Sequence, residues 1–169
     1  METETERLIL RRFQVSDAER LFEIYSDRET MKFMGGGPQT VDDERGALQR
    51  HREIYYDLYG FGLWGVVLKS ENKLLGRCGI IKQEIEGETM EEISYLIDRE
   101  YWNKGYVTEA AKAVVEVARE KYRLKKLIAL ILPENVGSIR VAEKCGFELE
   151  RMLEVHKIWN NVGLYARML

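Results

Sequence analysis

One stretch near the middle of the chain, residues 92–112, constrains the fold more than any other. Residues 93–97 are rich in the β-branched and aromatic side chains that strands favour, and three polar residues, 98–100, end the run. From Val107 to Tyr122 apolar side chains recur at helical spacing, with charged side chains on the opposite side. The pattern predicts a strand, a tight turn at Gly105, and a helix of about fifteen residues, long enough to cover one face of a sheet.

The turn between this strand and this helix has the properties of an anion site. The first backbone N–H groups of a helix have no partners inside the helix and carry partial positive charge. Gly105 lets the backbone turn sharply and approach a ligand closely, and Lys104 adds a full positive charge. A phosphate is therefore the expected ligand, and the alternative is an ordinary turn glycine before a helix that only packs.

Composition limits the class of protein. The 169 residues are near the usual size of one domain, and we expect residues 1–169 to form a single domain. The net charge of -3 argues against non-specific binding of nucleic acid. No apolar run reaches membrane-spanning length and no signal peptide is visible, so we expect a cytoplasmic protein without membrane contact. Cys78, Cys145, His51 and His156 fit no metal-ligand spacing, and no metal site is expected.

The other expected elements follow from the same periodicities. Strands are predicted at residues 7–13, 61–68, 74–81 and 127–132, and in a closing hairpin of residues 147–158 and 163–169 around a turn at 159–161. Helices are predicted after a cap at Ser16 or Asp17, from Thr40 toward Tyr56, and from a Ser138 cap to Lys144. Residues 93–97 and 127–132 are joined through a helix, which predicts parallel neighbours in one sheet.

Two local features of the predicted strands bear on the site. Gly76 and Gly79 are expected to mark bulges. The acidic run from Lys82 to Glu92 is expected to form a solvated hairpin end. From this run we retain only Glu92 as a candidate functional residue, because it enters the central strand.

Two linked motifs carry a family resemblance. The block from Tyr101 to Ala110, Tyr-Trp-Asn-Lys-Gly-Tyr-Val-Thr-Glu-Ala, and the block from Asn135 to Phe147 together resemble the GCN5-related N-acetyltransferase (GNAT) superfamily, in particular its RimJ/RimL branch. The resemblance implies an α/β (α+β) GNAT fold, in which a mixed central sheet of about seven strands has helices on both faces. Strands four and five of that sheet would splay apart at a bulge and hold acetyl-CoA in the gap.

The resemblance also assigns the candidate site residues. Glu92 would be the general base, Ser138 the proton donor to the departing thiolate, and Asn135 the residue that positions the cofactor or a water; Asn135 and Ser138 would also touch the cofactor. The pantetheine arm would be held by Tyr95, Leu96 and Ile97. The pyrophosphate would be held by Trp102, Asn103, Lys104, Gly105, Tyr106, Val107 and Thr108.

Two departures from the family pattern leave alternatives open. Val107 stands where the superfamily usually has Gly or Ala, and its side chain crowds the pyrophosphate site. Ala142 stands where many members have the Tyr that protonates the thiolate, so Ser138 is either the acid or only a helix cap. Glu92 is either the base or an exposed carboxylate at a strand edge.

The reaction that the resemblance implies is acetyl transfer from acetyl-CoA to a primary amine. Deprotonation at neutral pH costs about 1 kcal/mol for an α-amine and nearly ~5 kcal/mol for a lysine, which favours a protein N-terminal α-amine as acceptor. The alternatives are a small-molecule amine, such as an antibiotic, polyamine or amino acid, and a non-catalytic acyl-CoA-binding module. The acceptor walls are expected from the first two helices, the loop at residues 35–37 and the hairpin at 156–163, in a monomer or homodimer.

Overall fold

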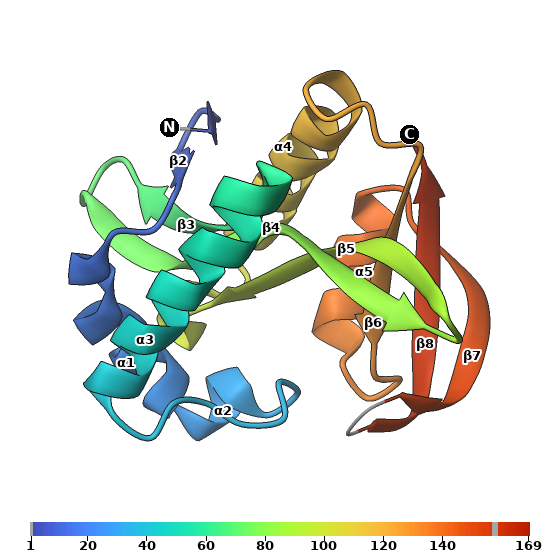
Figure 1. Cartoon of the computed structure of the whole chain (residues 1–169), viewed down its shortest axis with the longest axis horizontal. Helices are drawn as coiled ribbons and strands as arrows, with labels where there is room; N and C mark the ends of the chain where they lie inside the picture. Colours follow the sequence, from blue (N-terminus) through green and yellow to red (C-terminus); the bar gives the residue numbers. More distant parts are fainter. Residues whose placement is uncertain (1, 157–158) are drawn as a thin grey trace.

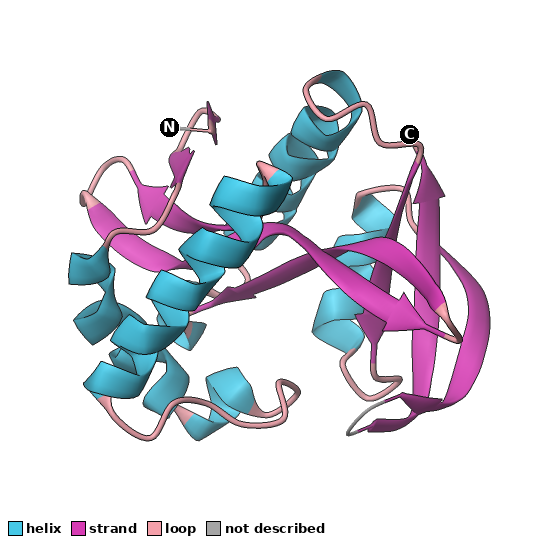
Figure 2. Ribbon diagram, viewed as in Figure 1, coloured by secondary structure: helices cyan, strands magenta, loops and turns pink. Residues whose placement is uncertain are grey.

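The computed structural model of the protein describes residues 2–156 and 159–169. One eight-stranded sheet runs through it in the order β1-β2-β3-β4-β5-β6-β8-β7, with helices packed on it (Figures 1 and 2). The strands are β1 (Thr3–Glu4), β2 (Leu8–Arg11), β3 (Leu63–Leu68), β4 (Lys73–Ile85), β5 (Glu88–Ile97), β6 (Lys126–Ile131), β7 (Glu148–His156) and β8 (Trp159–Met168). The expected mixed α/β architecture is confirmed, with eight strands in place of about seven because the short strand β1 was not predicted.

The four longer helices, α1, α3, α4 and α5, lie in the expected places, whereas the short segments α2 and η3 were not predicted. In chain order the helices are η1 (Val15–Asp17), α1 (Ala18–Ser26), α2 (Arg28–Met31), α3 (Val41–His51), η2 (Arg52–Tyr59), η3 (Arg99–Tyr101), α4 (Tyr106–Glu120) and α5 (Val136–Lys144). The π-helix η2 continues α3 past the predicted end at Tyr56. Among the described residues, no helix combines the length and the apolar character that crossing a membrane requires.

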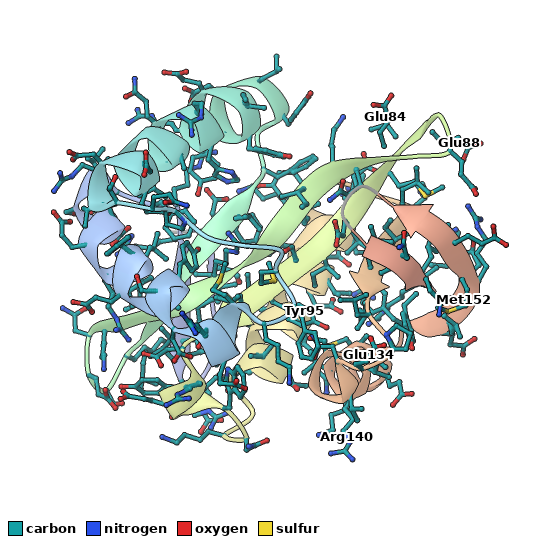
Figure 3. The ribbon with its side chains drawn as sticks, turned by 90° about the horizontal axis from the view of Figure 1, so that it is seen from below. Glu84, Glu88, Tyr95, Glu134, Arg140 and Met152 are labelled. Carbon is teal, nitrogen blue, oxygen red and sulfur yellow. The ribbon has the colours of Figure 1, made fainter. Side chains whose placement is uncertain are left out.

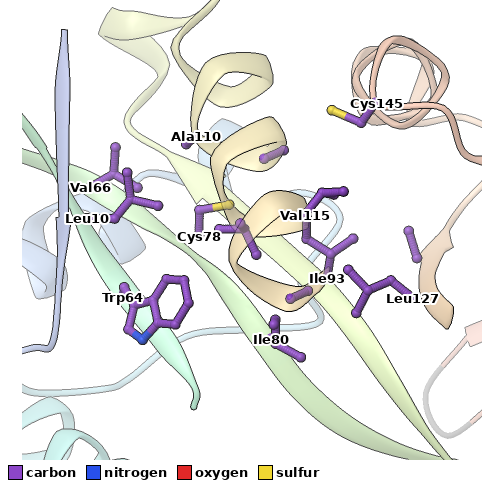
Figure 4. Packing of buried hydrophobic residues seen from close by; sticks show 14 of the residues in the cluster. Leu10, Trp64, Val66, Cys78, Ile80, Ile93, Ala110, Val115, Leu127 and Cys145 are labelled. Atoms are coloured by element: carbon purple, nitrogen blue, oxygen red, sulfur yellow. The ribbon is translucent and has the colours of Figure 1, made fainter. Parts of the chain in front are cut away.

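Helices cover both faces of the sheet, as predicted. On one face Leu21 of α1 and Leu48 of α3 pack in a buried cluster with Leu96 of β5. On the other face Val115 of α4 packs in a larger cluster with Ile93 of β5 (Figure 4). Because successive side chains of a strand point to opposite faces, β5 contributes to both clusters, and its backbone lies in the middle of the molecule.

The pairing of β5 with β6 explains where a ligand could enter the sheet. All neighbouring strands are antiparallel except these two, which are parallel as predicted. They pair at one position, Glu92 with Ile128, and no further pair follows in the described residues. The strands therefore splay apart beyond Glu92, as the resemblance implied.

The bulges differ from expectation. The β4–β5 ladder runs from Gly76–Ile97 to Ile85–Glu88 in constant register, so the bulge expected at the splay is absent from it. The β3–β4 register shifts between Val66 and Val67, next to Gly76, whose φ is 153°. The prediction for Gly79 was wrong, because the register there is continuous. A Cβ at Gly79 would lie 2.1 Å from the carbonyl oxygen of Gly62, so the glycine permits close approach of two backbones.

The helix starts confirm two predictions and correct one. Thr40 and Asp43 form the predicted capping box at the start of α3. Of the two alternatives before α1, Asp17 is the N-cap residue, and its carboxylate accepts the Gln14 N–H at 2.7 Å and closes the turn η1. Asn135, not Ser138, caps α5, because the Ser138 N–H donates to Asn135 Oδ1 at 3.1 Å.

One hairpin prediction was confirmed and one was wrong in detail. The acidic run at 82–92 forms the expected solvated hairpin end: β4 and β5 extend through it and turn at 86–87, and Glu84 and Glu88 mark this end of the hairpin in Figure 3. The predicted turn at residues 159–161 lies within β8, where Asn160 pairs with Val155 of β7. The connection at 157–158 lies outside the described residues.

Candidate active site

A cavity of about 170 Å³ lies where β5 and β6 separate. Residues 92–95 of β5 line one side of it and residues 129–132, from the end of β6, line the other. Arg77 and Gln83 of β4 also line it. Phe33 and Met34, which lie between α2 and the glycine loop in the sequence, contribute a further wall. Two of the expected acceptor walls contribute: the segment just before residues 35–37, and the closing hairpin through Val162. The helices α1 and α3 do not line the cavity directly.

The cavity brings together all three candidate catalytic residues. Glu92 of β5 lines it together with Asn135 and Ser138, which are more than forty positions away in sequence and lie at the start of α5. The side chain of Glu92 is buried, with 8% of its residue surface exposed, and its strand pairs on both sides at this point. The alternative of an exposed carboxylate at a strand edge is therefore wrong.

Ser138 makes two structural contacts through its backbone. Its N–H donates to the Asn135 side chain, and its carbonyl oxygen accepts from the Tyr95 hydroxyl at 3.0 Å. Neither of these bonds uses the Ser138 hydroxyl, but the Ser138 side chain also interacts with the Tyr95 hydroxyl. Ala142, at the position of the family's Tyr, is 2% exposed and packs in the core, so it offers no proton donor.

Tyr95 spans the gap between β5 and α5. Its hydroxyl bond to Ser138 crosses the splay, and in Figure 3 its side chain lies toward the helix that carries Arg140. Burial raises the pKa of this hydroxyl far above its usual range, so it stays a proton-bearing donor. Leu96 turns its side chain into the opposite cluster with α1 and α3, so the strand offers only its backbone to the gap at that position.

The predicted anion site at the start of α4 has the expected backbone geometry. Gly105 is the N-cap in a left-handed conformation, with φ 81°, and no side chain of the described chain caps the helix there. The residues before it, 102–104, are exposed. Trp102 folds back on the preceding strand, since its indole N–H donates to the Ile97 carbonyl oxygen at 2.9 Å. The first N–H groups of α4 therefore follow an exposed turn in which Gly105 has no Cβ, an arrangement that suits a phosphate.

The sequence did not reveal how this turn is held. Glu109, in the first turn of α4, accepts hydrogen bonds from the Thr5 hydroxyl and from the Arg7 backbone N–H at 3.0 Å, and pairs with the Arg7 guanidinium. Arg7 also donates to the Lys104 carbonyl oxygen at 3.0 Å. Burial would raise the pKa of Glu109, but the bonds from Thr5 and Arg7 outweigh it and hold the pKa below its usual range. The N-terminal segment thus fixes the turn.

A second group missed in the sequence lies at the other end of the cavity. Arg77 is half-buried in β4, and its guanidinium donates to the Tyr25 hydroxyl at 3.3 Å and lies 5.1 Å from the centre of that ring. Glu44 of α3, 5% exposed, is the acid that acts electrostatically on it. An arginine among the apolar residues 74–81 was the available signal, because a charged side chain inside a strand needs a partner.

The described residues contain no cluster of three or more His, Cys, Asp or Glu side chains that could bind a metal ion. The cavity and the anion site instead suit a long ligand with an amide-bearing arm and a pyrophosphate. The arm would lie in the splay between β5 and β6, and the pyrophosphate would lie at the start of α4. Coenzyme A has both parts.

Comparisons with known proteins agree with this assignment. The family model described as an acetyltransferase (GNAT) domain matches residues 7–148. The Bacillus subtilis protein YkkB is 33% identical over 96% of this chain and 93% of its own length. The Bacillus subtilis N-acetyltransferase YnaD is 31% identical over 89% of this chain and 84% of its own.

Solved structures give the same result. A GNAT-family acetyltransferase from Bacillus anthracis superposes with a TM-score of 0.82 and 31% identity, covering 98% of this chain and 96% of its own. Ribosomal-protein acetyltransferases share the fold at lower identity; a RimL structure in complex with coenzyme A has a TM-score of 0.80 and 15% identity, over 98% of this chain and 96% of that one. At this identity the likeness is one of fold.

Proposed function

Since the chain belongs to the GNAT family of acetyltransferases and is an acetyl-CoA-dependent N-acetyltransferase, we propose that its acceptor is the α-amine of a protein N-terminus. The observation that carries the proposal is the charge of the cavity. Among its described lining residues the side chains that carry a charge at neutral pH are one carboxylate, Glu92, and one guanidinium, Arg77. A polyamine or an aminoglycoside carries several positive charges and needs several acids, which this cavity does not offer.

The residues of the chain divide the work as follows. Glu92 takes the proton from the α-amine, whose nitrogen then attacks the thioester carbonyl carbon while the carbon–sulfur bond breaks. The Ser138 hydroxyl gives a proton to the departing thiolate and regains one from solvent, while Glu92 releases its proton to solvent. The Asn135 side chain holds the start of α5, where Ser138 lines the cavity. The backbone of Tyr95, Leu96 and Ile97 binds the pantetheine amides, and residues 102–108 bind the pyrophosphate.

Release of the CoA thiol from acetyl-CoA tests the acceptor class. The panel contains peptides with free N-termini, polyamines, aminoglycosides and amino acids. We expect turnover on peptides, and a loss of about 10²-fold or more in kcat for Glu92→Gln, because a general base contributes that much. Glu91→Gln is the matched control, since Glu91 is the adjacent residue and points to the opposite face of β5.

Turnover on polyamines or aminoglycosides but not on peptides would overturn the proposed acceptor. Tight acetyl-CoA binding with no thiol release from any amine would instead identify a non-catalytic module. An equal effect of Glu92→Gln and Glu91→Gln would remove Glu92 from the role of base.

Ser138→Ala tests the proton donor separately. Both backbone bonds of Ser138 survive this change, so the cap and the bond to Tyr95 remain. We expect kcat to fall by about 10²-fold while the melting temperature stays unchanged, because only the hydroxyl is lost. An unchanged kcat across the pH range would show that water, not Ser138, protonates the thiolate.

A further inference from the structure

We infer that Arg77 binds an anionic group of the acceptor, so that the preferred N-terminal peptide carries an acidic side chain at its second residue. This inference rests on the proposed function and specifies its substrate. It concerns the part of the cavity at the level of Leu96, four residues along the strands from Glu92.

Arg77 has more hydrogen-bonding capacity than its surroundings use. A guanidinium has five N–H donors, and the structure gives it one bond, the 3.3 Å contact to Tyr25. Its Nε atom is buried and has no hydrogen-bond partner among the described residues. A buried donor without an acceptor raises the free energy of the protein, so a ligand that supplies an acceptor to this N–H should bind favourably.

No side chain nearby neutralises Arg77 by direct contact. Glu44 is the acid that acts on it, yet no ion pair joins the two within 4.0 Å in the part of the chain that the structure describes. Burial raises the pKa of Glu44 to about 7, which keeps much of this carboxyl protonated near neutral pH. The positive charge of Arg77 therefore faces the cavity, which it lines together with Ser94 and Glu92.

The strand register sets the distance between the two ends of the cavity. Arg77 pairs with Leu96 and Ile81 pairs with Glu92, so Arg77 and Glu92 lie on the same face of the sheet, four residues apart along the strands. At the usual rise this is about 13 Å. Allowing about 3 Å for a hydrogen bond at each end leaves about 7 Å between the amine nitrogen and the anionic group.

A peptide with an acidic side chain at its second residue fits this separation. With the α-amine beside Glu92 and the chain extended along β5, the side-chain carboxylate of an Asp at the second residue lies about 7 Å from the amine. The charge-assisted, bidentate geometry that arginine offers to carboxylates would then fix the acceptor's direction along the strand.

The experiment compares peptides that differ only in Asp or Asn at the second residue. We expect wild-type kcat/KM to favour the Asp peptide by roughly tenfold, as hydrogen bonds to charged groups imply. Arg77→Gln should bring this ratio to about one, and Arg77→Lys should keep part of it. Tyr25→Phe is the matched control: it removes the Tyr25 bond but leaves the guanidinium, and should keep the preference. Melting temperatures and the KM for acetyl-CoA verify that each variant is folded.

A wild-type ratio near one, or a ratio that Arg77→Gln leaves unchanged, would overturn the inference. Failure of the proposed function gives a different result, because no peptide would then be acetylated. In that case 6-aminohexanoate and its amide take the place of the peptide pair, with the same expected dependence on Arg77. If neither pair turns over, calorimetric binding of the two peptides in the presence of CoA decides, and equal affinities would refute the role of Arg77.

Discussion

Glu44 shows how a single buried carboxyl group makes stability depend on pH. Folding leaves it 5% exposed, and this burial raises its pKa from 4.5 to about 7, with a smaller opposite effect of Arg77. The folded protein therefore binds this proton more tightly than the unfolded chain does. The resulting stabilisation is fully present below about pH 4.5 and is lost as the pH rises through about 7, with a total change of about 3 kcal/mol.

Glu44→Gln isolates this effect, because glutamine has a similar shape and no charge at any pH. The free energy of unfolding of the variant, relative to wild type, should rise by up to about 3 kcal/mol between about pH 4.5 and pH 8. Urea unfolding at several pH values measures it. The opposite contribution of His51, whose buried imidazole has a pKa lowered to about 4, is common to both proteins and cancels. If the free energies of unfolding of wild type and Glu44→Gln changed in parallel with pH, the raised pKa of Glu44 would be contradicted.

At the residue scale, the sequence predicts those candidate site residues that belong to a recognisable motif. Glu92, Asn135 and Ser138 were found because the family spacing marks them, and the structure brings them to one cavity. Arg77 and Glu44 were missed, because no local pattern shows that residues from β4 and α3 lie near each other. Their relation depends on how α3 crosses the sheet, which is a tertiary property.

At the scale of elements, the start of α4 depends on a segment about a hundred residues earlier in the chain. Thr5 and Arg7 bind Glu109 in the first turn of this helix, and Arg7 holds the carbonyl of Lys104 in the preceding turn. Residues near the N-terminus thus position the turn at which we expect the pyrophosphate to bind. A defect in this contact should affect both the helix and the ligand.

Glu109→Gln tests this contact, with Glu116→Gln as the matched control on the same helix. Glu109 loses its charge against Arg7 and part of its hydrogen bonding, so unfolding should become easier by about 1–2 kcal/mol, and CoA should bind more weakly. Glu116, in an exposed pair with Arg119, should change stability by less than about 0.5 kcal/mol. Urea unfolding and calorimetric CoA titration measure both effects. Equal behaviour of the two variants would show that the Arg7 contact is only a surface ion pair.

The start of a helix was predicted correctly where only one side chain could cap it, as at the Thr40 capping box. The predicted cap was wrong where two neighbouring side chains could each act as the cap. Asn135 and Ser138 are both able to cap α5, and the choice depends on Tyr95, which holds the Ser138 carbonyl from another strand. The closing turn was likewise misplaced, because long-range pairing of β7 and β8 decides the register there.

For the whole molecule, the sheet consists of two parts that join at one residue pair. Strands β1 to β5 and strands β6 to β8 are each fully laddered, whereas Glu92 and Ile128 alone connect them within the described residues. The parallel arrangement of β5 and β6 was predictable, because the apolar run at residues 127–132 follows β5 through a helix. That the pairing stops after one position was not, since it depends on the packing of α4 and α5 behind the strands.

Hydrogen exchange should detect this division. Without ligand, amides of residues 93–97 and 129–131 are expected to exchange faster than those of β3 and β4, because their strands lack a partner on one side. Added CoA should slow exchange in these two segments more than elsewhere, as pairing with the pantetheine arm requires. A uniform slowing over all strands would report only global stabilisation by ligand binding and would contradict a ligand lodged between β5 and β6.

The splay also has a consequence for behaviour in solution. Beyond Glu92, β5 presents an unpaired strand edge in the interior of a sheet, which the ladder geometry leaves ready to accept another extended chain. A protein without its cosubstrate thus carries a template for self-association that most sheets keep only at their rims. Occupancy of the gap then serves solubility as well as catalysis, and storage with CoA should keep concentrated samples monodisperse.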